Sequence, residues 1–113
     1  MIVGDDARFI YLMRYYTKVS GYPVLVVPLD EVVTSAEQVK PAVIVLESDL
    51  VVSASRDMLQ ALKADQATCG IPIIVCSWQD AEMNMLAQEA DCYLQKPVAY
   101  EEFLSALNMM THI

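Results

Sequence analysis

The sequence predicts an α/β protein in which a five-stranded parallel sheet carries helices on both faces. Two observations support this prediction. Short apolar runs of strand length alternate five times with segments of helical periodicity, a pattern typical of parallel sheets with helical crossovers. In addition, the run Pro41–Leu46 has no polar interruption, as expected of a strand buried on both faces.

The first half of the chain is expected to supply three strands and two helices. A short strand at 1–3 leads to Asp6, which is positioned to cap a helix ending at Ser20 and Gly21. That helix has an apolar face made of Phe9, Leu12, Met13 and Tyr16. A second strand is predicted at 23–27. Asp30 then caps a helix reaching about residue 39, and Lys40 and Pro41 break it before the third strand.

The second half repeats the alternation twice. After Glu47, a polar loop at 53–55 is expected to lead into a helix that buries Met58, Leu59 and Leu62. A fourth strand is predicted at 71–76, a helix at 80–90 and a fifth strand at 92–94. The last helix, at about 100–110, has an apolar face made of Phe103, Leu104, Leu107 and Met110.

Size and composition limit the classes of function. The 113 residues suit one domain spanning 1–113, either complete or cut from a longer protein, and the 56% apolar share fits a sheet covered on both sides. No apolar run approaches the roughly 20 residues of a membrane span, and acids at 5–6 interrupt the first one, so we expect a cytoplasmic protein. The net charge of −8 argues against nucleic-acid binding. It is compatible with a basic partner, with a bound cation, or simply with solubility.

The reactive side chains do not suggest an enzyme. Cys76 and Cys92 lie in apolar runs and are interpreted as small core residues, while His112 is the only histidine. No nucleophile and base with an orienting third group can be assembled from them. We therefore expect a protein without catalytic turnover.

Polar residues follow four of the five predicted strands. Asp5, Glu47, Ser77 and Lys96 stand at the ends of the first, third, fourth and fifth strands. Carboxyl ends of parallel strands meet at one edge of a sheet, so these side chains could lie within reach of one another. Two carboxylates suit Mg²⁺, and a lysine could neutralise a carboxylate or a phosphoryl group.

At these residues the chain resembles the receiver domain of two-component response regulators. The similarity covers nearly the whole length, and it is carried by Val3–Asp6, Gly21–Tyr22, Pro41–Glu47, Leu62–Thr68, Ile71–Ser77 and Ala90–Pro97. The resemblance implies a flavodoxin-like fold with strand order 2-1-3-4-5. It also implies an aspartate at the end of the third strand that takes a phosphoryl group from a histidine kinase, assisted by Mg²⁺, acidic residues, a Ser or Thr, and a lysine.

The chain departs from the receiver pattern at the acceptor itself. Glu47 stands where receivers have aspartate, and its extra methylene displaces the nucleophilic oxygen in a site where about 1 Å matters. The same length lets Glu47 imitate the phosphorylated state by pairing with Lys96 or Ser77. The acidic pair is also altered, because its first member falls on Gly4 and its second on Asp5. Metal binding should be weakened, although Asp49 could compensate.

Two further departures surround the acceptor. Trp78 follows Ser77 where receivers usually have a small residue, and it could cover the pocket mouth. Val51 and Ser55 replace the usual proline and glycine of the loop after the acceptor. Both changes affect access to the expected site.

Several residues also have a simpler interpretation. Glu47 could be a solvated strand-end acid, Asp5 a helix cap and Ser77 an ordinary turn residue, whereas the following proline makes Lys96 harder to dismiss. Tyr93 belongs either to a partner surface or to the half-buried core. Methionines at 83, 85, 109 and 110 could form an adaptable docking face or simply core.

The resulting hypothesis is a degenerate receiver that acts as a protein-interaction module. Its partners would be a histidine kinase or an output-domain protein. The resemblance also implies a homodimer through the helix at 80–90, the strand at 92–94 and the helix at 100–110. Two alternatives stay open: a working receiver that accepts phosphate on Asp49, and a module that binds a small ligand or metal in the same crevice.

Overall fold

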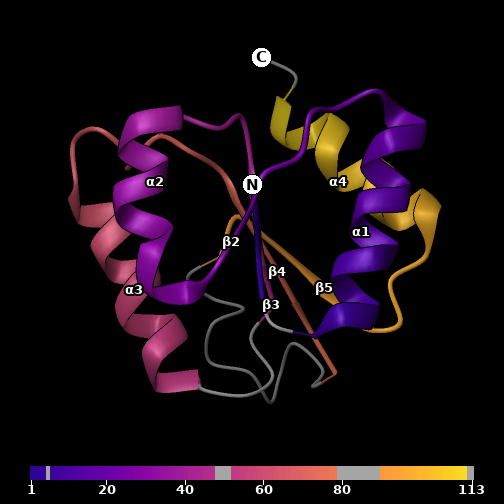
Figure 1. Cartoon of the computed structure of the whole chain (residues 1–113), viewed down its shortest axis with the longest axis horizontal. Helices are drawn as coiled ribbons and strands as arrows, with labels where there is room; N and C mark the ends of the chain where they lie inside the picture. Colours follow the sequence, from indigo (N-terminus) through magenta and orange to yellow (C-terminus); the bar gives the residue numbers. More distant parts are fainter. Residues whose placement is uncertain (5, 48–51, 79–89, 112–113) are drawn as a thin grey trace.

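The computed structural model describes residues 1–4, 6–47, 52–78 and 90–111. Five parallel strands form one sheet in the order β2-β1-β3-β4-β5, which confirms the predicted fold class and strand order (Figure 1). The strands are β1 (Ile2–Val3), β2 (Val26–Val27), β3 (Ile44–Glu47), β4 (Ile73–Ser77) and β5 (Cys92–Gln95). The described helices are α1 (Ala7–Ser20), α2 (Val32–Val39), α3 (Val52–Ala64) and α4 (Tyr100–Thr111).

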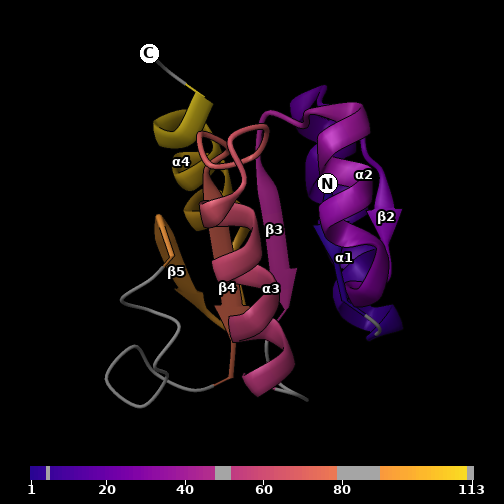
Figure 2. The ribbon, with the colours of Figure 1, turned by 90° about the vertical axis from the view of Figure 1, so that its left-hand side faces the viewer.

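The sheet separates two hydrophobic cores. Figure 1 shows α2 and α3 on one side of the sheet and α1 and α4 on the other, and Figure 2 looks onto the sheet from the side of α2 and α3. Alternate strand residues face opposite sides, so Ile44 and Leu46 pack beneath α2 and α3 while Val45 packs beneath α1 and α4. Among the described helices, none combines the length and apolar character that a bilayer span requires.

Helix α1 begins and ends as its sequence predicts. Asp6 caps it, since the Asp6 side chain accepts a hydrogen bond from the Arg8 backbone N–H at 2.9 Å. Gly21 ends it in the left-handed region with φ 82°, and its N–H donates to the Lys18 carbonyl. The periodicity did not indicate that Thr17 is buried; its hydroxyl donates to the Met13 carbonyl at 2.8 Å.

Several predicted boundaries were wrong or shifted, including those of the fourth strand, which spans Ile73–Ser77, and of the fifth, which reaches Gln95. The second strand shortens to Val26–Val27, because Pro23 has no N–H to donate and the strand lies at the sheet edge. Asp30 does not cap α2, because it lies inside a 3₁₀ turn at Leu29–Glu31 that precedes the helix. Residues 53–55 are part of α3 rather than a loop. The third strand begins later and includes Glu47 as its last residue. The predicted helix at 80–90 lies almost entirely outside the described residues.

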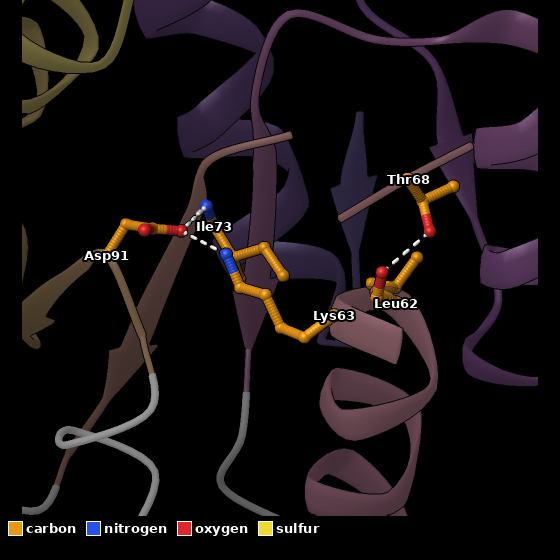
Figure 3. A network of polar contacts seen from close by, with 5 residues as sticks. All are labelled: Leu62, Lys63, Thr68, Ile73 and Asp91. Carbon is orange, nitrogen blue, oxygen red and sulfur yellow. Dashed lines mark hydrogen bonds and ion pairs between the residues drawn. The ribbon is translucent and has the colours of Figure 1, made fainter. Parts of the chain in front are cut away.

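Asp91, which directly precedes β5, makes contacts at the amino ends of β4 and β5. Its carboxylate accepts a hydrogen bond from the Ile73 backbone N–H at 2.7 Å and an ion pair from Lys63 Nζ at 2.8 Å, so it ties α3 to β4 (Figure 3). Nearby, the Thr68 hydroxyl donates to the Leu62 carbonyl at 2.7 Å just beyond the end of α3. These contacts give a structural role to parts of three sequence segments that resemble receivers.

The three cysteines have different environments. Cys76 is fully buried, as predicted, whereas Cys92 is only half-buried and Cys69 is exposed. Burial raises the pKa of the Cys92 thiol, so its thiolate fraction is small at neutral pH.

We therefore expect iodoacetamide to alkylate Cys69 first and Cys92 much more slowly at pH 7.5. The rate at Cys92 should rise with pH as the thiolate fraction of that buried thiol grows. Peptide mapping by mass spectrometry over pH 7 to 10 measures both rates in one sample. Equal rates at Cys69 and Cys92 at pH 7.5 would contradict this expectation.

Candidate functional site

The carboxyl ends of the strands bring the predicted site residues together. In the register of the sheet, Glu47 lies opposite Cys76, so Ser77 extends β4 one residue beyond it. Ser77 in turn lies opposite Gln95, and Lys96 follows directly. The Lys96 backbone N–H donates to the Ser77 carbonyl at 2.7 Å, which holds the turn after β5 against the end of β4. Parallel pairing thus places residues 47, 77 and 96 at one edge.

Glu47 and Lys96 form a buried ion pair at this edge. Lys96 Nζ lies 2.5 Å from Glu47 Oε2, and their side chains are only 4% and 3% exposed. The other carboxylate oxygen, Oε1, accepts a hydrogen bond from the Asp6 backbone N–H at 3.3 Å. Asp6 is the N-cap of α1, where the helix dipole favours negative charge. Both oxygens of Glu47 are therefore engaged with positive or donor groups.

Lys96 is also packed by aromatic rings. Its Nζ lies 4.6 Å from the centre of the Phe9 ring and 5.7 Å from that of Trp78, distances typical of cation–π contacts. Phe9 comes from α1 and Trp78 follows β4. The ammonium group therefore contacts the Glu47 carboxylate and two ring faces, which limits the positions it can take.

Gly4 provides the space that the Glu47 side chain occupies. A Cβ atom placed on Gly4 would lie 3.0 Å from both Cβ and Oε1 of Glu47, closer than ordinary van der Waals contact. This is a close approach between β1 and β3 that only glycine allows without movement. Gly4 and Glu47, the two positions at which the resemblance predicts other residues, therefore lie side by side.

Trp78 lies beside this pair and lines an open hollow. Its side chain is 60% exposed. The hollow has a volume of about 450 Å³, and it is bounded by α1, the end of β4 and the segment after β5; its lining residues are Asp6, Arg8, Phe9, Leu12, Trp78, Lys96, Pro97 and Val98. Lys96 thus contacts the buried carboxylate and also borders an opening to solvent.

The remaining predicted residues have varied positions. Ser77 is fully buried, and Tyr93 is half-buried against the core under α2 and α3. Asp5 and Asp49, the predicted metal ligands, lie outside the described residues. Within the described residues no cluster of three or more acidic, histidine or cysteine side chains could hold a metal. Gly4 has no side chain to offer a metal, and the Glu47 carboxylate is engaged by Lys96 and the Asp6 backbone.

Sequence reasoning missed two contributors to this site. Phe9 was assigned only to the apolar face of α1, although its ring contacts the Lys96 ammonium. Gly4 was interpreted as a lost acid, whereas its lack of a side chain makes room for Glu47. The second could have been suspected from a longer acid and a glycine at two strand ends predicted to be adjacent. The first needed the three-dimensional position of α1.

The chain is similar to known proteins in structure but not detectably in sequence. No protein-family model and no curated protein sequence matches the chain. Solved structures do match. The receiver domain of a sensor histidine kinase from Pseudomonas aeruginosa PAO1, which has magnesium in its active-site cleft, superposes with a TM-score of 0.86 at 22% identity, covering 99% of this chain and 95% of that one.

Two further solved receiver domains have the same fold as this chain. The receiver domain of a response regulator from Bermanella marisrubri has a TM-score of 0.82 at 19% identity, covering 98% of this chain and 95% of that one. The receiver domain of a modulated diguanylate cyclase from Desulfovibrio desulfuricans G20 has a TM-score of 0.79 at 27% identity, covering 98% and 90%. The chain therefore has the fold of two-component receiver domains. Within that fold, this chain has glutamate at the end of the third strand, paired with the lysine that follows the fifth.

Proposed function

We propose that this chain is a degenerate receiver domain that acts as a protein-interaction module in two-component signalling. Glu47 replaces the phosphorylated aspartate with a carboxylate that Lys96 holds in place. The proposal depends chiefly on one observation, the buried ion pair between Glu47 and Lys96. The partners would be a histidine kinase or the protein that carries the output domain.

The state of the Glu47 carboxylate argues against phosphoryl transfer. One oxygen is paired with Lys96 and the other accepts from the Asp6 backbone, so a rotation of the carboxylate toward a phosphorus atom would weaken one of these contacts. Separating a buried ion pair leaves both charges poorly solvated, which adds to the barrier. The contact with Gly4 also leaves no room at that position for a second acid. These contacts favour a Glu47 carboxylate that keeps its position over one that accepts a phosphoryl group.

Intact-mass spectrometry after incubation with acetyl phosphate and Mg²⁺ tests the proposal. We expect the unmodified chain to gain no phosphoryl group. Glu47→Asp shortens the side chain by one methylene and withdraws its carboxylate from the position beside Gly4. It is therefore the variant that could gain a phosphoryl group. Glu47→Asn is the matched control, because it has the same size as aspartate without a nucleophilic oxygen.

Each pattern of labelling has a definite meaning. Labelling of Glu47→Asp alone would show that the glutamate silences an otherwise competent pocket. Absence of labelling in all three proteins would show that the pocket is degenerate beyond its acceptor, and both results agree with an interaction module. A phosphoryl group on the unmodified chain would overturn the proposal, and peptide mapping would then show whether Asp49 is the acceptor.

A further inference from the structure

Helix α1 has a charge pattern that differs from that of the rest of the chain. It contains three of the seven basic residues and none of the fifteen acidic ones, in a protein of net charge −8. Its solvent side, which we call the α1 outer face, consists of Arg8, Tyr11, Arg14, Tyr15, Lys18 and Val19, all of them exposed. The other segments contain four basic and all fifteen acidic residues. Positive charge is therefore concentrated on one helix.

The same face exposes large apolar side chains. Tyr11 is 76% exposed, Tyr15 58% and Val19 57%. Their spacing of four residues aligns them along one side of the helix, next to the basic side chains. Tyrosine and arginine are the residue types enriched at the centres of protein interfaces, where an aromatic ring contributes area and a guanidinium binds carboxylates.

This face is continuous with the hollow beside the site. Arg8 belongs to both, and Leu12, one turn further along α1, lines the hollow. Trp78 and Pro97 provide further apolar wall. A volume of about 450 Å³ is ample for one apolar side chain of a partner. The surface thus combines the partly apolar hollow with the basic and aromatic side chains of the α1 outer face.

We propose that the α1 outer face and the hollow together bind an acidic protein segment, with one apolar side chain of that segment inserted beside Trp78. Charge complementarity selects an acidic partner, since a basic one would be repelled by three cations on α1. A nucleic acid is a poorer occupant, because fifteen acids elsewhere on the chain repel a polyanion. The inference rests on the proposed interaction role, whether or not phosphorylation has been lost.

Selection from a random library of 12-residue peptides displayed on phage tests the proposal. We expect enriched peptides to place aspartates or glutamates around one large apolar residue. Synthetic copies should change the emission of Trp78, the only tryptophan, when it is excited selectively. Binding should weaken at least tenfold in Arg14→Gln/Lys18→Gln.

A matched control separates local from general charge effects. Gln60→Glu/Gln66→Glu makes the same change in net charge at exposed positions in and just after α3, on the other side of the sheet (Figure 1). Peptide affinity should change by less than about twofold in this variant, since exposed charges beyond a Debye length are largely screened. Equal weakening in both variants, or enrichment of neutral or basic peptides, or no enrichment, would overturn the proposal.

The same series of experiments tests two other ligands for this surface, a second copy of the chain and a nucleic acid. Sedimentation velocity would reveal a dimer lost in Arg14→Gln/Lys18→Gln, which would make a second copy of the chain the occupant. Tighter binding of a 12-nucleotide single strand than of the selected peptides would indicate nucleic acid, and either result would overturn the proposal. These experiments are independent of the phosphorylation test. Labelling of Glu47 would refute the degenerate receiver while leaving the α1 surface intact.

Discussion

Replacing Lys96 by methionine is expected to lower the free energy of unfolding by about 3–5 kcal/mol, because it leaves the Glu47 carboxylate buried without its partner. The pair is 2.5 Å apart and both side chains are almost fully buried, so water cannot substitute for the missing ammonium. Domains of this size are stable by only about 5–15 kcal/mol, so the loss should be large in urea unfolding. Glu47→Met should also destabilise the protein, since it removes the buried carboxylate that pairs with Lys96.

The double variant Glu47→Met/Lys96→Met shows whether the loss comes from the unpaired charge. We expect it to be more stable than either single variant, because two apolar side chains replace both charges. Lys63→Met is the matched control, because it breaks an ion pair with Asp91 whose side chains are 34% and 37% exposed. Its loss should be about 1 kcal/mol or less. A loss below 1 kcal/mol in Lys96→Met would show that the Glu47–Lys96 pair does not hold the site.

Gly4→Ala is expected to lower the free energy of unfolding by about 1–3 kcal/mol, the usual result of forcing an extra methyl group into a packed region. The added Cβ would lie 3.0 Å from Cβ and Oε1 of Glu47. Oε1 cannot move away freely, because the same carboxylate is tied to the Asp6 backbone and to Lys96. Urea unfolding of the variant measures this loss.

Two comparisons make the Gly4 experiment specific. Gly70→Ala introduces a methyl group with no heavy atom within 4 Å, so its stability should stay within about 1 kcal/mol of the parent. In the Glu47→Asp background, Gly4→Ala should cost less than in the parent, since Oε1 is gone and only the contact with Cβ remains. Equal losses in the two backgrounds would show that Gly4 and Glu47 are energetically independent.

Together these variants test whether two departures from the receiver pattern form one arrangement. The resemblance to receivers predicts an acid at the position of Gly4 and an aspartate at the position of Glu47. The structure places them in contact, so neither can revert alone without consequence for the other. Restoring an acid at Gly4 would collide with Glu47, while shortening Glu47 would lengthen its distance to Lys96. The arrangement is consistent with a site maintained in one state.

The sequence determined the architecture of this protein and the identity of its strand-end residues. Apolar periodicity reports which side chains are buried, so runs such as Ile44–Leu46 and the spacing of Phe9 and Met13 identified strands and helices directly. Boundaries were less certain where local signals compete. Asp30 resembles a helix cap, yet the backbone forms a 3₁₀ turn there first.

Only the tertiary structure decided what the site residues contact. Glu47 and Lys96 are 49 residues apart, and the sequence left both Lys96 and Ser77 as candidates to pair with Glu47. The choice depends on the sheet register, on the direction of each side chain and on the space left by Gly4, and each of these arises from packing between distant segments. Local periodicity carries no information about such distances. The convergence of the strand-end residues at one edge of the sheet was therefore predictable. The particular contacts that engage both oxygens of the Glu47 carboxylate were not.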